Sequence, residues 1–372
     1  MRDYLESFQL VLEVEGPVFV GNGKEIGKKE YVTLQRGKIG VVDVEKLYYV
    51  LKRKGLSSKY EEFLMMPKSS DLTKWLRDNR IQQSEMQQFV KYELDYGDAQ
   101  IEKGTRLQIM EIMKDPYGNP YIPGSSVKGM LRTILMNYEM LQNPTAYAGL
   151  SIKISGAVDN FRGRSNYLKR EASEGEALTF RSLNRPDTRP DDAVNDVLAG
   201  LLVSDSYPLS IDDLVLCQKI EVHTDGSEKK LNLLRESLKP GTKIVIPLTI
   251  DSTTCKYAKE DIEDAVSSFS HFYYKTFCSH FPSDRPKETT VWLGGGTGYA
   301  SKTAIYPLFN DRDRVMVVKT ILEKTVHNRQ HGHANDHKQG VSPHILKCTY
   351  YQGKTVQMGQ CRMQILPFCP AP

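Results

Sequence analysis

Apolar and polar residues alternate at the start of the chain, and this alternation predicts a half-buried strand. Its apolar positions are Phe8, Leu10, Leu12 and Val14. Further strands are expected around 31–34, 38–42 and 105–113, with turns rich in glycine, proline and asparagine near them. Asp43 stands where a helix N-cap belongs, and apolar residues at helical spacing follow it, which predicts a short helix.

The clearest helix pattern lies in "YIPGSSVKGMLRTILMNYEML", residues 121–141. Apolar residues recur there at steps of three and four, as they do on one face of an α-helix. They are Val127, Met130, Leu131, Ile134, Leu135, Tyr138 and Leu141. Ser125 and Ser126 occupy positions where N-caps belong, so the helix is expected to begin beside them.

The periodic pattern stops beyond residue 155. The segment 155–192 has few aliphatic residues and no sustained period, so we interpret it as a long insertion or linker, partly disordered when unbound. Strands are then expected in "LAGLLVSDS", in "LCQKIEVHT" and at 242–250. A helix with Ile262 to Phe277 on its apolar face follows, then a short strand at 314–318 and a closing hairpin.

Strands mixed with a few helices in each half predict an α+β fold in two domains. The expected division is an N-terminal domain of residues 1–154, a flexible basic insertion of residues 155–195 and a C-terminal domain of residues 196–372.

Composition is that of an ordinary soluble protein. The 372 residues suffice for two or three domains, with 40% hydrophobic and 26% charged residues. No apolar run approaches the roughly 20 residues of a membrane helix, and acidic residues in the first apolar stretch argue against a signal peptide. The six cysteines contain no C-x-x-C pair, so we expect neither a disulfide scaffold nor a cysteine zinc site, and a reducing cytoplasm fits best.

A glycine-rich stretch, "VWLGGGTGYASKT", occupies residues 291–303. A nucleotide-binding P-loop would need glycine at Ser301, and a dinucleotide fingerprint would need glycine at Tyr299, so nucleotide hydrolysis is disfavoured. The stretch is then either a tight turn or a loop whose bare N–H groups approach a phosphate, with Lys302 adding charge and Tyr299 stacking on a base. The candidate RNA contacts are Gly294, Gly295, Gly296, Gly298, Tyr299 and Lys302.

The start of the predicted helix is a second candidate. Helix N-termini attract anions through free N–H groups and a partial positive charge. The side chains that would assist there are Ser125, Ser126, Lys128 and Arg132. A well-capped amphipathic helix with two solvated cations explains the same residues, although Gly129 is costly in a helix and indicates a close neighbour or ligand.

Histidines cluster in "HNRQHGHANDHKQGVSPH". Five of the eight lie within it: His327, His331, His333, His337 and His344. The segment has no helix or strand period, so a mobile polar loop explains it; RNA contact, a metal site with Asp336, or general acid–base cleavage of RNA are the alternatives.

The net charge of +4 permits a nucleic-acid partner without demanding one. Local excesses are larger. In residues 161–190 seven cations, Arg162 and Arg164 among them, oppose four acids, and in residues 324–347 four oppose one, so each stretch carries +3. These stretches suit a phosphate backbone, and Arg162 and Arg164 join the candidate RNA contacts.

Taken together, "YIPGSSVKGMLRT", "VSDS", "LGGGTGYASKT" and the ending "SPHILKCTYYQGKTVQMGQCRMQI" resemble the RAMP superfamily of CRISPR proteins. Within it, the chain resembles the end-capping fifth subunit of the type III-A Csm effector complex. The resemblance implies two ferredoxin-like (RRM-like) domains that grip guide RNA (crRNA) and cap its 3′ end in antiviral defence. It implies other Csm subunits as partners, above all the repeated backbone subunit, with host ribonucleases trimming the guide.

Within the resembling family, this sequence departs from the subunit that cuts RNA, and this departure argues against catalysis. The acids between Phe8 and Asp43 do not match the target-cutting aspartate of the backbone subunit, and the aromatic stacking motifs of true RRMs are missing, so base-specific readout is not expected. We therefore predict a non-catalytic RNA-binding subunit without cofactor or bound metal. A histidine- or metal-dependent endoribonuclease that processes CRISPR RNA is the alternative, and an adaptor that touches RNA only weakly is a third hypothesis.

Overall fold

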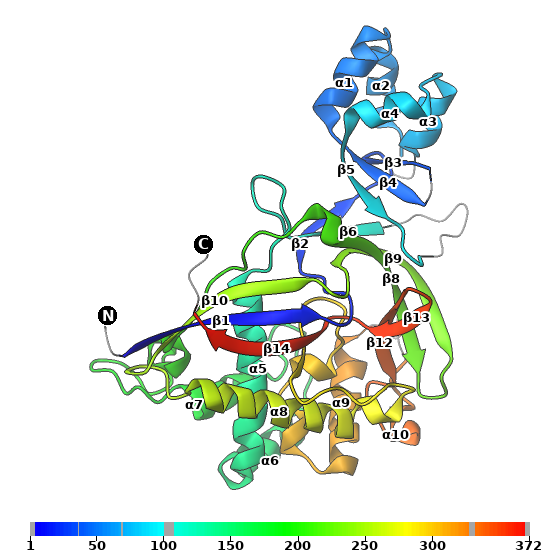
Figure 1. The fold of residues 1–372 in the computed structure, drawn as a ribbon. Coiled ribbons are helices and arrows are strands. Elements are labelled where there is room, and N and C mark those ends of the chain that lie inside the picture. Colours follow the sequence, from blue (N-terminus) through cyan, green and yellow to red (C-terminus); the bar gives the residue numbers. More distant parts are fainter. Residues whose placement is uncertain (1–3, 36, 68–69, 100–107, 327–331, 369–372) are drawn as a thin grey trace.

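The fold was analysed in a computed structural model, which describes residues 4–35, 37–67, 70–99, 108–326 and 332–368. Two sheets form the body of the molecule, and a small separate unit stands above them (Figure 1). None of the helices in these ranges combines the length and apolar character that crossing a membrane requires.

The first sheet is antiparallel throughout. Its strands, in spatial order, are β11 (Thr290–Trp292), β14 (Gln360–Pro367), β1 (Leu5–Val14), β10 (Lys243–Asp251) and β7 (Leu201–Val203). The alternation predicted for the start of the chain is confirmed, since Leu10, Leu12 and Val14 are buried on one face of β1.

The second sheet is antiparallel except between β6 and β9, which run parallel. Its order is β13 (Lys354–Gln357), β12 (Ile345–Tyr351), β8 (Leu214–His223), β9 (Glu228–Leu238), β6 (Gln108–Ile112) and β2 (Gly21–Ile26). The predicted closing hairpin is confirmed: it is formed by β12 and β13, with Gln352 and Gly353 at its turn.

The sheets join the two halves of the sequence. Strand β1 lies between β10 and β14, and β6 pairs with β9, so each sheet draws strands from both sides of residues 155–195. One continuous core contains Leu10, Leu131 and Phe269 together. The α+β class is confirmed, but the separation into residues 1–154 and 196–372 is corrected by this exchange of strands.

The main helices gather beside the first sheet (Figure 1). They are α5 (Gly124–Gln142), α6 (Ala148–Ala157), α7 (Lys169–Phe180), α8 (Lys259–Thr276), α9 (Asp311–Thr325) and the short α10 (Asp336–Gln339). The predicted apolar stripes of α5 and α8 are confirmed, because Leu131 and Ile134 of α5 and Val266 and Phe269 of α8 are buried.

Two local predictions are wrong. The strand expected at 314–318 is the middle of α9, whose start is fixed by Asn310: its side chain accepts a hydrogen bond from the Asp313 N–H at 3.0 Å. Branched residues there imitate a strand, but this cap and two acids in the first turn favour the helix. The insertion is not featureless either, because it forms α7, which buries Phe180 in the main core.

The unit above the sheets was not anticipated. It consists of the strands β3 (Tyr31–Thr33), β4 (Lys38–Val42) and β5 (Val90–Asp95), with the helices α1 (Val44–Arg53), α2 (Ser57–Met65), α3 (Leu72–Asp78) and α4 (Gln83–Met86). Its own hydrophobic core contains Leu47, Phe63 and Leu76. The unit is inserted between β2 and β6, which are paired neighbours.

Candidate nucleic-acid interface

The N-terminus of α5 is already occupied by an acid of the protein. Asp205, in the "VSDS" segment after β7, accepts a hydrogen bond from the Gly124 N–H at 2.8 Å. A Cβ on Gly124 would lie 2.3 Å from the Val203 carbonyl oxygen, so glycine permits this contact. The prediction that Ser125 and Ser126 cap the helix is wrong, because Pro123 is the N-cap and both serines lie in the first turn.

Lys128 and Arg132 are engaged inside the protein. The Lys128 ammonium donates to the Leu198 carbonyl oxygen at 2.7 Å, and burial lowers its pKa. The Arg132 guanidinium binds the carboxylates of Glu176 and Asp196 and lies 4.3 Å from the centre of the Phe180 ring. The expectation of two solvated cations is therefore corrected: Arg132 attaches α7 to α5.

One face of α5 nevertheless stays open. Ser125 is exposed, and a Cβ on the exposed Gly129 would meet no atom within 4 Å. The space that Gly129 leaves is therefore not filled by the described part of the protein. A strand of ribose-phosphate could approach the helix backbone closely on this face.

The glycine-rich loop divides into two parts. Gly294 and Gly295 pack on the connection between β1 and β2: the Gly295 N–H donates to the Phe19 carbonyl oxygen at 2.6 Å, and a Cβ on Gly294 would lie 2.2 Å from that oxygen. These two glycines serve the fold, as a tight turn would. Gly296 and Gly298 have φ values of 94° and 91°, which favour glycine, and they face cationic side chains.

Those cations come from the second sheet. A Cβ on Gly296 would lie 3.2 Å from Nη1 of Arg235 on β9, and one on Gly298 would lie 3.6 Å from Cγ of Lys347 on β12. Lys302 follows in the loop; its side chain is exposed, yet the surrounding protein and the charge of Arg235 lower its pKa. Burial and the charges of Lys219 and Arg235 likewise lower the pKa of Lys347.

We call this group the loop cations; it consists of Lys219, Arg235, Lys302 and Lys347. Glu221 pairs with Lys347 at 2.6 Å and with Lys219 at 3.4 Å. Burial lowers the pKa of Arg235, and its Nη1 atom is buried without a hydrogen-bond partner in the described part of the chain. This nitrogen is sealed from solvent, so a phosphate would meet the bare peptide groups of Gly296 and Gly298 and the charge of the neighbouring cations, not Nη1 itself.

A cavity of about 440 Å³ unites three of the predicted segments. Arg132 from α5, Arg164 from the insertion, and Tyr299 and Lys302 from the loop line it. Tyr299 is largely packed against protein, and burial raises its pKa, so only its cavity side could meet a base. Arg162 and Arg164 are exposed, as their predicted role requires.

The sequence-based site omitted the cations of β8, β9 and β12. Arg235 and Lys347 stand alone in strand-like stretches far from residues 291–303, and only the pairing of β12 with β8 and of β8 with β9 brings them to the loop. Charged residues within otherwise apolar strands were the available signal.

Of the described histidines in the histidine-rich segment, His333 and His344 meet at Asp336, and His337 lies apart from them. His327 and His331 lie outside the described residues. His333 is buried with its Nδ1 on Asp336, whereas His337 is exposed on α10.

Known proteins identify the class to which this fold belongs. A family model described as the RAMP superfamily matches residues 11–308. The chain therefore belongs to the RAMP superfamily, and the ferredoxin-like character expected of its domains follows from that membership.

Curated relatives make the assignment more specific. "CRISPR system Cms protein Csm5" of Mycobacterium tuberculosis (strain H37Rv) is 30% identical over 98% of this chain and 99% of that protein. The protein of the same name from Streptococcus thermophilus is 27% identical over 85% and 84%. Within the superfamily the chain is a member of the Csm5 family of type III-A CRISPR systems.

Solved structures share the fold. One chain of a "Csm-crRNA-target RNA ternary complex in type III-A CRISPR-Cas system" superposes with a TM-score of 0.69 at 19% identity, covering 96% of this chain and all of the other. The crystal structure of "T.onnurineus Csm5" gives 0.57 at 18% identity, covering 95% and 99%.

Proposed function

We propose that this chain is a non-catalytic subunit of a type III-A Csm effector complex that binds guide RNA through its phosphates. Membership of the Csm5 family supports the assignment to the complex. A chain of similar fold comes from an assembly named for both crRNA and target RNA, which supports the RNA partner. The subunit would cap the 3′ end of the guide beside the repeated backbone subunit, in the cytoplasm.

The observation that carries the RNA-binding proposal is the group of loop cations around Gly296 and Gly298. Lys219 and Lys347 share one acid, Glu221, and Lys302 and Arg235 form no ion pair within the described ranges. Lys302 and Arg164 extend the positive surface to the rim of the cavity. Phosphate oxygens would satisfy these donors without reading bases, so binding should tolerate sequence changes and weaken with salt.

The proposal excludes cleavage by this subunit. The names of the relatives do not favour an endoribonuclease. The two described histidines of the histidine-rich segment that do come together, His333 and His344, direct their Nδ1 atoms at the buried Asp336 carboxylate, and His333 is only 4% exposed, so this pair is engaged with protein groups. General acid–base catalysis would need two such groups at one scissile phosphate. The link to host ribonucleases finds no support in the comparisons and stays a prediction.

The test combines retention and cutting of labelled repeat-containing RNA by the purified chain. We expect Lys302→Glu with Arg164→Glu to weaken retention at least 10-fold at 100 mM salt. If each residue contacts one phosphate, the slope of log Kd against log salt should fall by about 1.4, since a single-strand contact contributes about 0.7. No RNA should be cut with Mg²⁺, Mn²⁺ or EDTA.

A matched control changes the same charge elsewhere. Lys52→Glu with Lys59→Glu alters two exposed lysines of the small unit and should leave both retention and its salt slope unchanged. If both double variants weaken RNA retention equally, the loss reflects the change in net charge alone. That result would contradict an RNA site at Lys302 and Arg164. Cleavage that disappears in His333→Ala would contradict the non-catalytic proposal.

A further inference from the structure

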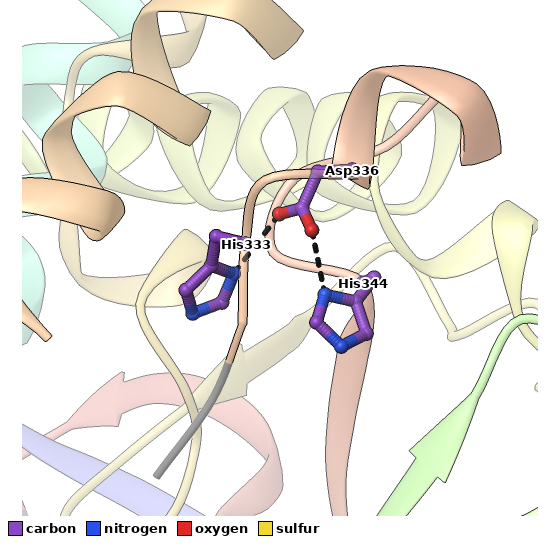
Figure 2. Close-up of side chains that lie close together, drawn as sticks. All are labelled: His333, Asp336 and His344. Carbon is purple, nitrogen blue, oxygen red and sulfur yellow. Dashed lines mark hydrogen bonds and ion pairs between the residues drawn. The ribbon is translucent and has the colours of Figure 1, made fainter. Parts of the chain in front are cut away.

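Three side chains of the histidine-rich segment converge on one point. His333 and His344 direct their Nδ1 atoms at the Asp336 carboxylate, one to each oxygen, at 3.0 and 2.6 Å (Figure 2). His333 precedes α10, Asp336 begins it, and His344 directly precedes β12. The three candidate ligand atoms lie within 4.8 Å of one another.

The surroundings hold these groups in place. Ser342 donates its hydroxyl proton to Oδ2 of Asp336 at 2.7 Å. The ring of His223, from the end of β8, stacks on His344 with ring centres 5.6 Å apart. Such outer contacts are typical of metal sites, where they orient the ligands.

The cluster is also buried. Asp336 has no exposed surface, and His333 is 4% exposed. Within the described part of the chain, the ion-pair partners of this carboxylate are the two imidazoles, and neither is a lysine or an arginine. A buried carboxylate is costly without a compensating positive charge. A divalent cation between the three groups would supply that charge.

We propose that His333, Asp336 and His344 form a binding site for a divalent transition metal, with Zn²⁺ the best match. Two imidazole nitrogens and one carboxylate oxygen are ligands that zinc prefers. At ligand distances of about 2.0–2.2 Å, tetrahedral ligand atoms stand roughly 3.3 Å apart. The ion would replace the hydrogen bonds at 3.0 and 2.6 Å, and the three ligand atoms, which lie within 4.8 Å of one another, would draw together around it.

The site would connect two neighbouring segments of the chain, one of which leads to the loop cations. It ties the segment that leads into α10 to the start of β12, and β12 carries Lys347 three residues after His344. Metal binding to the folded state alone stabilises that state in proportion to the affinity. This function is independent of RNA binding and does not depend on the proposed role in the Csm complex.

The experiment uses the untagged full-length chain, because a histidine tag would itself bind metal. Chelator-treated protein is titrated with Co²⁺, read by visible absorption, and with Zn²⁺ in competition; metal content is measured by mass spectrometry. We expect one metal per chain and a higher melting temperature with Zn²⁺. Asp336→Asn and His344→Ala should each lower affinity more than 10-fold, the least expected when a ligand is lost.

His337→Ala is the matched control, since it removes an exposed histidine from the same short helix. It should keep the metal stoichiometry and affinity. A wild-type chain that takes up no Co²⁺ or Zn²⁺ at micromolar concentrations would overturn the proposal, and this result is decisive even if a variant fails to fold. Wild-type affinity in Asp336→Asn, or loss of the metal in His337→Ala, would also overturn it.

Discussion

At the scale of single residues, side chains that a sequence presents as free cations can be structural. Arg132 satisfies two carboxylates and covers the Phe180 ring, and Lys128 donates to a main-chain carbonyl. The opposite holds for Arg235, which sits in a strand yet keeps a buried nitrogen without a partner among the described residues. Function at this surface depends on which donors the fold leaves unsatisfied.

A substitution at Arg132 separates these roles. Arg132→Ala leaves Glu176 and Asp196 without their partner, so we expect the free energy of unfolding to fall by about 1–3 kcal/mol. RNA retention, measured at a temperature where the variant stays folded, should change less than 3-fold. Urea denaturation provides the stability measurement.

Arg170→Ala is the control, since it removes an exposed arginine from α7, the helix that Arg132 binds through Glu176, and should leave stability unchanged. A large loss of RNA retention in Arg132→Ala at unchanged stability would show that Arg132 serves RNA and not the fold.

At the scale of elements, the sequence predicted the helices and strands that have a regular apolar period. It missed those whose order depends on tertiary contacts. Strand β1 and helices α5 and α8 were expected because their apolar period matches their geometry. The helix α7 was missed because its order depends on tertiary contacts: a Cβ on Gly175 would lie 2.8 Å from Cε of Met136, and Glu176 pairs with Arg132. The pattern of apolar residues within the segment does not reveal such contacts.

The small unit is the largest element that the sequence did not reveal. It is attached at paired strands, and Tyr92 on β5 reaches the main body by donating to Glu236 at 2.7 Å, where Lys114 also binds. Its helices pack around a core of their own, whereas Tyr31, Ile39 and Leu94 of its strands belong to the main core. A core confined to the helices and the facing strand residues favours opening of the helices without the main sheets.

Phe63→Ala tests that separation. Removing this buried ring should cost about 3–5 kcal/mol. Amide hydrogen exchange should therefore accelerate in α1, α2 and α3, while β1 and β10 keep their protection.

Leu10→Ala is the counterpart in the main core, because Leu10 is equally buried in β1. It should accelerate exchange in the first sheet. Faster exchange spreading from Phe63→Ala into β1 and β10 would contradict two independently opening parts.

At the scale of the whole molecule, the fold converts a modest net charge of +4 into a local positive surface. The sequence predicted RNA contacts in the glycine loop, the helix start and the insertion. The structure places Arg132, Arg164, Tyr299 and Lys302 around one cavity, and RNA binding there stays a prediction. It could not predict that Asp205 would occupy the helix end, or that β9 and β12 would bring Arg235 and Lys347 to the loop. Both results depend on contacts between distant parts of the chain: Gly124 and Asp205 are 81 positions apart, and β12 pairs with β8 more than 120 residues earlier.

The central claim is that RNA backbone lies against Gly296, Gly298 and the loop cations. Ultraviolet crosslinking of the assembled complex, followed by mass spectrometry of the RNA-linked peptides, tests it most directly. We predict crosslinks in peptides containing Lys302 and Arg164, and none in the small unit between β3 and β5. Crosslinks confined to that unit, with residues 296–302 unmodified, would contradict the account.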